Sequence, residues 1–188
     1  LNATFGGDPA LPGHIALVSQ SGAICTGMLD WSGPRQLGFS TMVSLGAGAD
    51  VDFGDVLDYL ALDPKTHSIL LYVEGIQHSR QFMSGLRAAA RLKPVVVVKA
   101  GRHAGGARAA KSHTGALVGS DDIFNTVLER AGAVRVWAVT QLFAAAQVFG
   151  TGKRAYGNRL AIITNGGGPG VVAVDQAVER GLKIPQFS

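Results

Sequence analysis

Short apolar runs rich in β-branched residues alternate along the chain with longer stretches whose apolar residues recur at helical spacing. This alternation constrains the fold strongly, because repeated strand–helix units imply parallel strands joined by right-handed crossovers. The expected strands are residues 14–19, 39–45, 68–73, 95–98 and 134–136. The expected helices are residues 21–31, 52–62, 79–92, 121–131 and 141–149. The sequence therefore predicts an α/β fold with a doubly wound parallel sheet and helices on both faces.

The pattern changes after residue 150, where a polar stretch separates this long series of strands and helices from a short second one. Residues 151–158 are predicted to be a linker. Residues 159–164 are then expected to form a strand and residues 170–180 a helix. One strand and one helix are too few for a domain. We therefore expect residues 1–150 to form one domain and residues 159–188 to be the truncated beginning of a second α/β domain.

Composition excludes several classes of protein. Hydrophobic residues make up 47% of the chain, too many for a disordered protein. No apolar run approaches the length of roughly 18 residues that a membrane span needs. The single cysteine, Cys25, excludes an internal disulfide and fits a reducing compartment, so a cytoplasmic protein is expected. The net charge of +4 is not gathered in any basic run, so we expect no nucleic-acid partner. Because the chain begins with Leu1, we expect a fragment of a longer protein.

Two glycine-containing turns follow predicted strands and open predicted helices. The residues of interest are Ser19, Ser21 and Gly22 in the first turn, and Asn165, Gly166, Gly167 and Gly168 in the second. Ligands of doubly wound sheets bind beyond the carboxyl ends of the strands, and glycine lets backbone N–H groups approach an anion closely. A helix N-terminus adds partial positive charge, so both turns are candidate phosphate sites. The alternatives are that Ser21 is only a helix N-cap and that the second turn is a flexible hinge.

Neither turn completes a standard nucleotide-binding motif. No glycine group has the spacing of a Rossmann fingerprint, and the nearest approach to a Walker A loop has Ala110 directly before Lys111. No pair of histidines has the spacing of a zinc site, and Cys25 lies in an apolar helical run. We therefore predict no metal site.

One histidine and one glutamate are the candidate chemical groups. His113 lies among small residues, which leave an imidazole accessible, although a solvated loop histidine would have the same neighbours. Glu74 follows the strand expected at residues 68–73, where a carboxylate could accept a hydrogen bond from an imidazole N–H. The alternative for Glu74 is an acidic residue favoured by the dipole of the next helix. The residues alone leave both choices open.

Five short segments follow one another in a specific order and spacing. They are Ser19 to Gly22, Glu74 to Gly75, Lys99 to Arg102, Ser112 to Ala116, and Asn165 to Gly170. Together they resemble the ADP-forming acetyl-CoA synthetases and, more distantly, succinyl-CoA synthetase. The resemblance covers nearly the whole chain. It implies that residues 1–150 form a flavodoxin-like domain and that residues 159–188 begin a CoA-ligase-type domain.

The resemblance also implies a reaction, which is acid–thiol ligation through an acyl phosphate and a phosphohistidine. His113 would be the phosphorylated histidine and Glu74 the residue that supports it. The helix N-termini at Ser21–Gly22 and after Gly166–Gly168 would hold the phosphate from two domains. The substrates would be CoA, phosphate, and ADP or ATP, with Mg²⁺ accompanying the nucleotide on a different domain. No tightly bound cofactor is expected here.

The family's CoA-binding Rossmann domain and its ATP-grasp domain are expected outside these residues, in the same protein or in a partner subunit. A small carboxylic acid would be the remaining substrate, and a homo-oligomer is compatible with the family. A second interpretation is that the chain resembles the synthetase-like region of bacterial protein lysine acetyltransferases, through residues 29–31. Such a region would sense an acyl-CoA without catalysing a reaction. A third interpretation is a flavodoxin-like protein that binds a flavin.

Overall fold

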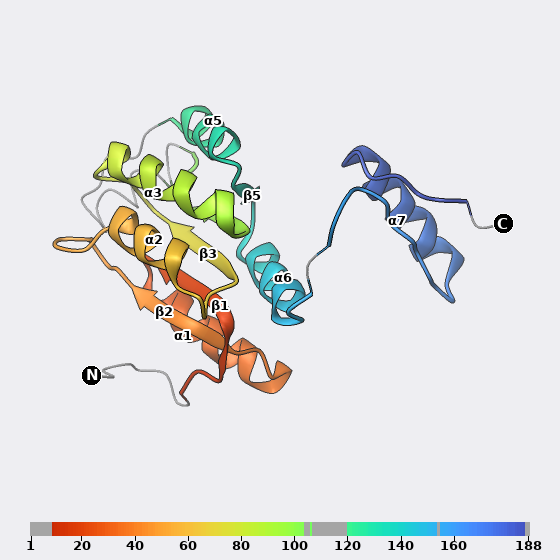
Figure 1. The fold of residues 1–188 in the computed structure, drawn as a ribbon, viewed down its shortest axis with the longest axis horizontal. Helices are drawn as coiled ribbons and strands as arrows, with labels where there is room; N and C mark the ends of the chain where they lie inside the picture. Colours follow the sequence, from red (N-terminus) through yellow and green to blue (C-terminus); the bar gives the residue numbers. More distant parts are fainter. Residues whose placement is uncertain (1–8, 104–105, 107–119, 154, 187–188) are drawn as a thin grey trace. The chain divides into compact units, whose positions relative to one another are not determined.

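The computed structural model describes residues 9–103, 106, 120–153 and 155–186, which belong to two compact units. The first unit ends at Lys153, and the second runs from Arg154 to Ser188. Figure 1 shows a sheet with helices in the first unit and a single labelled helix in the second.

A five-stranded parallel sheet forms the centre of the first unit. Its strands are β1 (Pro12–Ser19), β2 (Phe39–Ser44), β3 (Ser68–Val73), β4 (Val95–Lys99) and β5 (Val134–Val136). Their order in the sheet is β2-β1-β3-β4-β5, which is the flavodoxin-like order of doubly wound proteins. The fold class predicted from the alternating pattern is therefore confirmed.

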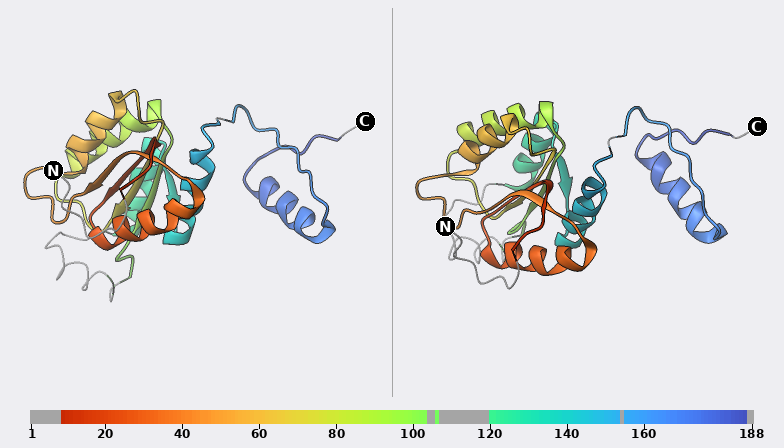
Figure 2. Two further views of the ribbon diagram at one scale, coloured as in Figure 1. Left: turned by 90° about the horizontal axis from the view of Figure 1, so that it is seen from below. Right: turned by 60° about the horizontal axis from the view of Figure 1, so that its bottom comes forward.

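Helices cover both faces of this sheet, as Figure 2 shows. They are α1 (Gly22–Ser32), α2 (Phe53–Leu62), α3 (Ser79–Leu92), α5 (Asp121–Ala131) and α6 (Val139–Gly150), with a short 3₁₀ helix at Gly33–Arg35. Successive strand residues point to opposite faces, so Leu71 packs in the core with α2, α3 and α5, whereas Leu70 packs in the core with α1 and α6. Both leucines are fully buried. This two-sided burial explains why the central strands are apolar throughout rather than alternating.

Two glycines allow α2 and α3 to pack closely. A Cβ atom on Gly54 would lie 2.5 Å from Cγ of Gln81, and one on Gly85 would lie 2.8 Å from the carbonyl oxygen of Gly54. Real Cβ atoms do not tolerate such distances, so larger residues would force the helices apart. Close packing of the pair keeps α3, which follows Glu74, at a fixed position against the sheet.

The second unit corrects two expectations about residues 159–180. Its helix α7 (Gly167–Glu179) begins at Gly167, because Pro169 is tolerated in a first helical turn. The expected strand at residues 159–164 is absent, and the described residues there form only a single parallel bridge between Arg159 and Lys183. A strand needs a neighbour to pair with, and the described part of this unit supplies none beyond that bridge.

Candidate functional site

The strand order of the sheet reverses between β1 and β3, and two predicted site residues lie at this point. β2 flanks β1 on one side, whereas β3, β4 and β5 follow on the other. Ligands of doubly wound sheets bind in the crevice beyond the carboxyl ends of the strands at such a switch point. Ser19 is the last residue of β1, and Glu74 directly follows β3.

Ser19 shapes the turn between β1 and α1. Its side chain is fully buried. Its Oγ accepts a hydrogen bond from the N–H of Ser21 at 3.0 Å and donates one to the carbonyl oxygen of Ser21 at 2.8 Å. Ser21 is the N-cap of α1, and its Oγ accepts a hydrogen bond from the N–H of Ile24 at 3.4 Å. The N-cap role of Ser21 is confirmed, and its phosphate-binding role stays a prediction.

Gln20 is not among the predicted site residues, yet its buried side chain joins this turn to the residues after β3. Its Oε1 accepts hydrogen bonds from the backbone N–H groups of Glu74 at 2.6 Å and Gly75 at 3.0 Å. Its Nε2 donates to the carbonyl oxygen of Gly75 at 2.9 Å. From the sequence, a glutamine in a polar turn is expected to be exposed. Only its hydrogen bonds to the backbone after the neighbouring strand β3 show this role.

Glu74 lies at the same end of the sheet as the first turn, as predicted from its position after a strand. Its side chain is buried. Burial raises the pKa of the Tyr72 hydroxyl above its ordinary value, and the negative charge of Glu74 raises this pKa further. The carboxylate therefore acts on a neutral tyrosine two residues before it. Because Gln20 holds the backbone of Glu74, the carboxylate starts from a fixed main-chain position.

The turn before α7 has the same local hydrogen bonds as the first turn. Thr164 Oγ1 accepts a hydrogen bond from the N–H of Gly166 at 3.0 Å and donates one to its carbonyl oxygen at 3.1 Å. Gly166 is the N-cap of α7 and, being glycine, offers no side-chain oxygen to the helix. Asn165, which occupies the position of Gln20, is exposed. Gly167 and Gly168 lie within the first turn of the helix rather than in the loop.

At three glycines of the predicted phosphate sites, neither the backbone conformation nor the packing of the described residues requires a glycine. Gly22, Gly167 and Gly168 do not have positive φ angles. A Cβ atom on Gly167 or Gly168 would meet no described atom within 4 Å, and one on Gly22 would only touch Ser44 Oγ at 3.6 Å. Their small size therefore leaves open space at two helix N-termini, as the close approach of an anion requires.

The predicted site residues fall into three groups. The structure brings Ser19, Ser21, Gly22 and Glu74 together at one end of the sheet in the first unit. It places Asn165, Gly166, Gly167 and Gly168 together at the N-terminus of α7 in the second unit. His113 lies outside the described residues.

The described residues offer neither a metal site nor a reactive thiol. They contain no group of three or more His, Cys, Asp or Glu side chains that could hold a metal ion. Burial raises the pKa of the Cys25 thiol, so little reactive thiolate forms at neutral pH, in agreement with its predicted place in the core. No helix among the described residues is long and apolar enough to cross a membrane.

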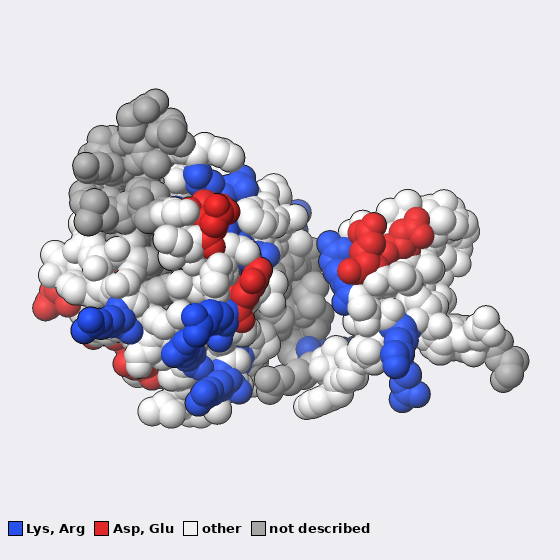
Figure 3. Space-filling model, turned by 90° about the horizontal axis from the view of Figure 1, so that it is seen from above, with Lys and Arg blue, Asp and Glu red and all other residues white. Residues whose placement is uncertain are grey.

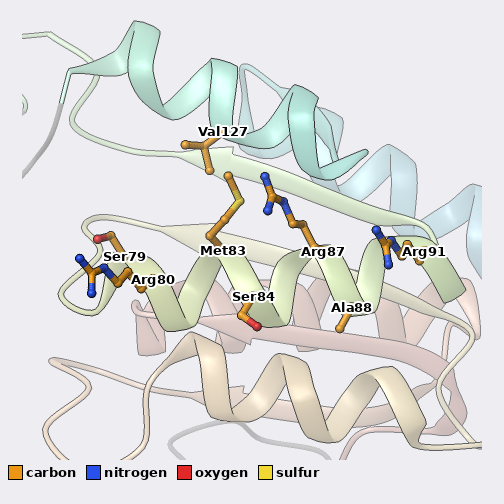
Figure 4. Close-up of a pocket in the computed structure, with 8 residues that line it drawn as sticks. All are labelled: Ser79, Arg80, Met83, Ser84, Arg87, Ala88, Arg91 and Val127. Carbon is orange, nitrogen blue, oxygen red and sulfur yellow. The ribbon is translucent and has the colours of Figure 1, made fainter.

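A groove of about 640 Å³ lies on the outer surface of α3, where Val127 of α5 also lines it. Figure 4 shows its arginines, Arg80, Arg87 and Arg91, extending from one helix. Among the described residues, no carboxylate, histidine or cysteine lines this groove. In the space-filling view of Figure 3, basic side chains of the first unit lie close to acidic ones. The groove therefore offers positive charge and two serine hydroxyls, Ser79 and Ser84, but no described base that could activate them.

Comparison with known families identifies the domain type. The model of the succinyl-CoA ligase-like flavodoxin domain matches residues 12–149, a range that includes the five strands and the five α-helices described in the first unit, the last of them up to residue 149.

Curated relatives extend the similarity into the second unit. The chain is 41% identical over 184 residues to the alpha subunit of acetate–CoA ligase [ADP-forming] I from Pyrococcus furiosus, covering 98% of this chain and 40% of the subunit. It is 44% identical over 188 residues to acetate–CoA ligase [ADP-forming] I from Archaeoglobus fulgidus, covering 100% of this chain and 27% of that protein. The chain thus spans well under half the length of these relatives.

A solved structure shows the same fold. Acetyl-coenzyme A synthetase 1 of Ca. Korarchaeum cryptofilum, described as dinucleotide forming and in complex with phosphate and ADP, superposes with a TM-score of 0.89 at 36% identity. The similarity covers 100% of this chain and 41% of that one. Its apo form gives a TM-score of 0.88.

Proposed function

The chain belongs to the family of succinyl-CoA ligase-like flavodoxin domains, and we propose that it is part of an ADP-forming acyl-CoA synthetase. Relatives that carry this activity in their names match it along 98% and 100% of its length. We propose further that residues 159–188 begin a second α/β domain and that CoA-binding and ATP-grasp domains complete the enzyme. Nucleotide, with its Mg²⁺, would bind on those other domains.

The proposed reaction has three steps. Phosphate attacks the thioester carbon of acyl-CoA, the C–S bond breaks, and free CoA leaves an acyl phosphate behind. An imidazole nitrogen of His113 then attacks the phosphorus atom, the P–O bond to the acyl group breaks, and the carboxylate leaves. Finally, the phosphohistidine passes its phosphoryl group to ADP, which gives ATP and restores the imidazole.

Glu74 would support the histidine in the second step. Attack by one imidazole nitrogen leaves positive charge on the ring, which a carboxylate stabilises by accepting a hydrogen bond from the other ring N–H. The partly positive N-terminus of α1, with Ser19, Ser21 and Gly22 before it, would stabilise the phosphoryl oxygens. The N-terminus of α7, with Asn165 to Gly168, would do the same from the second unit. Fixed dipoles need no reorganisation when the phosphoryl group arrives.

The observation that carries this proposal is the set of three hydrogen bonds between the Gln20 side chain and the backbone of residues 74 and 75. They hold the backbone of a buried carboxylate next to an open, glycine-containing helix N-terminus. An acid that stabilises an imidazolium and a helix end that stabilises a phosphate are the two groups that a phosphohistidine site needs.

The test is to incubate the full-length protein with acetyl phosphate or with labelled ATP. We expect an acid-labile, base-stable phosphate on His113, which mass spectrometry of rapidly quenched protein would locate. His113→Ala should remove it, and Glu74→Gln should slow its formation by at least about tenfold, because the imidazolium loses its counter-charge.

Two exposed residues supply matched controls, since His78→Ala and Glu129→Gln make the same chemical changes elsewhere. Neither should alter the rate of labelling by more than about twofold. A folded full-length protein that binds acyl-CoA but never becomes phosphorylated would contradict the ligase proposal and favour the sensing region of an acetyltransferase.

A further inference from the structure

A further cavity lies at the carboxyl ends of β3, β4 and β5. Its volume is about 340 Å³. It is lined by residues that follow or end β3, β4 and β5, including Tyr72, Lys99, Arg102, His103 and Trp137. Lys99 to Arg102 is a segment that the sequence resemblance singled out and that the proposed reaction leaves without a role.

Lys99 is the most unusual of these residues, because a lysine at the end of a central strand is almost fully buried. Among the described residues, its Nζ donates a hydrogen bond only to the carbonyl oxygen of Ala100, at 3.1 Å. The ammonium also lies over the ring of Phe124, 5.6 Å from its centroid. An ammonium group has three N–H donors, and the described residues accept a hydrogen bond from one of them.

The charges around Lys99 are mostly positive. The described charges that act on it are Asp121, Arg135 and Arg102, and burial is the largest cause that lowers the pKa of its ammonium. The one carboxylate of this group, Asp121, already pairs with Arg135 at 2.6 Å. Arg135 is buried in turn, and its Nε has no hydrogen-bond partner among the described residues. An anion in the cavity would offset this excess of positive charge.

An aromatic ring and a helix N-terminus complete the cavity wall. The guanidinium carbon atoms of Arg102 and Arg135 lie 5.2 Å and 4.1 Å from the centroid of the Trp137 ring, which orients both cations. Ala138 and Val139, the N-cap and first residue of α6, also line the cavity. The partial positive charge of this helix N-terminus therefore adds to that of the side chains.

We propose that this cavity binds the phosphoryl group of a small phosphate substrate, inorganic phosphate or an acyl phosphate, through Lys99 and Arg102. Lys99 ends β4 and Arg102 follows it, and their ammonium and guanidinium groups can form charge-assisted hydrogen bonds with phosphoryl oxygens. The choice of a phosphate substrate rests on the proposed function. The assignment gives this domain a phosphate-binding position separate from the N-terminus of α1.

The cavity adjoins the proposed reaction centre. In the sheet, Val73 pairs with Lys99, so Glu74 and Ala100 are the next residues along neighbouring strands. Along the chain, Arg102 is also followed by the segment that contains His113. A phosphate bound here would lie at the end of β4, and Glu74, the carboxylate proposed to support the histidine, lies at the end of the neighbouring strand β3.

Trp137 makes the proposal directly testable, because it lines the cavity and the chain has only one other tryptophan, Trp31, which packs against Phe143 instead. The experiment titrates the 188-residue chain with inorganic phosphate, and separately with acetyl phosphate, at constant ionic strength. Two-dimensional NMR follows the two indole N–H signals. We expect the Trp137 signal to shift and saturate while the Trp31 signal stays in place. Acetate alone should shift neither.

Arg102→Gln should raise the dissociation constant for phosphate by about tenfold, since a charge-assisted hydrogen bond is lost. Lys99→Met should do the same, and circular dichroism checks that this variant is folded. The matched control is Arg87→Gln, which removes an equal charge from the exposed groove on α3 (Figure 4) and should change the constant by less than about twofold.

The proposal is overturned if the Trp137 signal does not move, if acetate moves it equally, or if Arg102→Gln has no larger effect than Arg87→Gln. Repeating the titration on His113→Ala separates this inference from the proposed function, because equilibrium binding needs no phosphoryl transfer. Binding that persists in this variant supports the cavity, whereas a protein with His113 intact that binds phosphate but is never labelled would contradict only the phosphohistidine proposal.

Discussion

The turn before α1 and the turn before α7 share one local structure but differ in their surroundings. In each, a hydroxyl at the end of the preceding segment bonds both the N–H and the carbonyl oxygen of the residue two positions on, Ser19 to Ser21 and Thr164 to Gly166. Ser19 is fully buried, whereas Thr164 is exposed. The same short-range chemistry therefore produces a turn inside a packed sheet in one unit and on an open surface in the other.

The middle residue of each turn, Gln20 or Asn165, shows how tertiary contacts differ between the two turns. Gln20 is buried and makes three hydrogen bonds to the backbone after β3. Asn165 is exposed, and none of the described residues forms a hydrogen bond with its side chain. Local sequence thus determines the shape of such a turn. Hydrogen bonds to a neighbouring strand are needed as well before the turn can hold other site residues in place.

Replacing these two amides gives the largest expected difference between the turns. Gln20→Ala leaves two buried N–H groups and one carbonyl oxygen without their partners and should lower the free energy of unfolding by about 2–4 kcal/mol. Asn165→Ala should lower it by less than about 0.5 kcal/mol. Urea denaturation of both variants measures the difference. Equal losses would show that the first turn is not held by its partner strand.

Replacing the hydroxyls gives a smaller difference. Ser19→Ala removes two hydrogen bonds in a buried place and should cost about 1–2 kcal/mol of unfolding free energy. Thr164→Ala removes the same two bonds where water can replace them, so its cost should stay below about 0.5 kcal/mol. Thermal unfolding of the two variants is the measurement, and a costlier Thr164→Ala would mean that the second turn is shielded from water.

Replacing one glycine in each turn should have the smallest effect on the unfolding free energy. The expected effect is the same for both turns. Gly22→Ala and Gly168→Ala meet no crowding within the described structure, so each should change the unfolding free energy by less than about 1 kcal/mol. Both should nevertheless slow phosphate labelling of His113 in the full-length protein, because the added methyl group occupies the space kept for an anion. Normal labelling in either variant would remove that turn from the proposed site.

Much of the first unit could be predicted because its signals are local. Periodicity and β-branched runs located the strands that begin at Ser68 and Val95, and continuous apolar character indicated that helices cover both faces. The strand order reversal then placed Glu74 and the Ser19–Gly22 turn together, as a doubly wound sheet requires. The strand expected at residues 159–164 was wrong, since apolar character alone cannot supply a pairing partner.

The residues that the sequence did not reveal act through distant partners. Gln20 owes its role to backbone groups after β3, and Lys99 was expected to lie just beyond its strand but is a buried strand residue. Both residues lie in segments that carry the family resemblance, but nothing in the sequence shows that their side chains are buried or which groups they contact. Their roles arise from packing, which brings charge and hydrogen bonds from several strand ends to one place.

The hydrogen bond from Glu74 N–H to Gln20 joins residues 54 positions apart, and this separation has a consequence for how the chain folds. Contacts of such long range form only after much loop-closure entropy has been lost, so they come late compared with local helices. During synthesis, the helix end at Gly22 emerges well before Glu74 exists. A partly made chain therefore has a helix terminus without its carboxylate, and the site comes into being only when β3 pairs with β1.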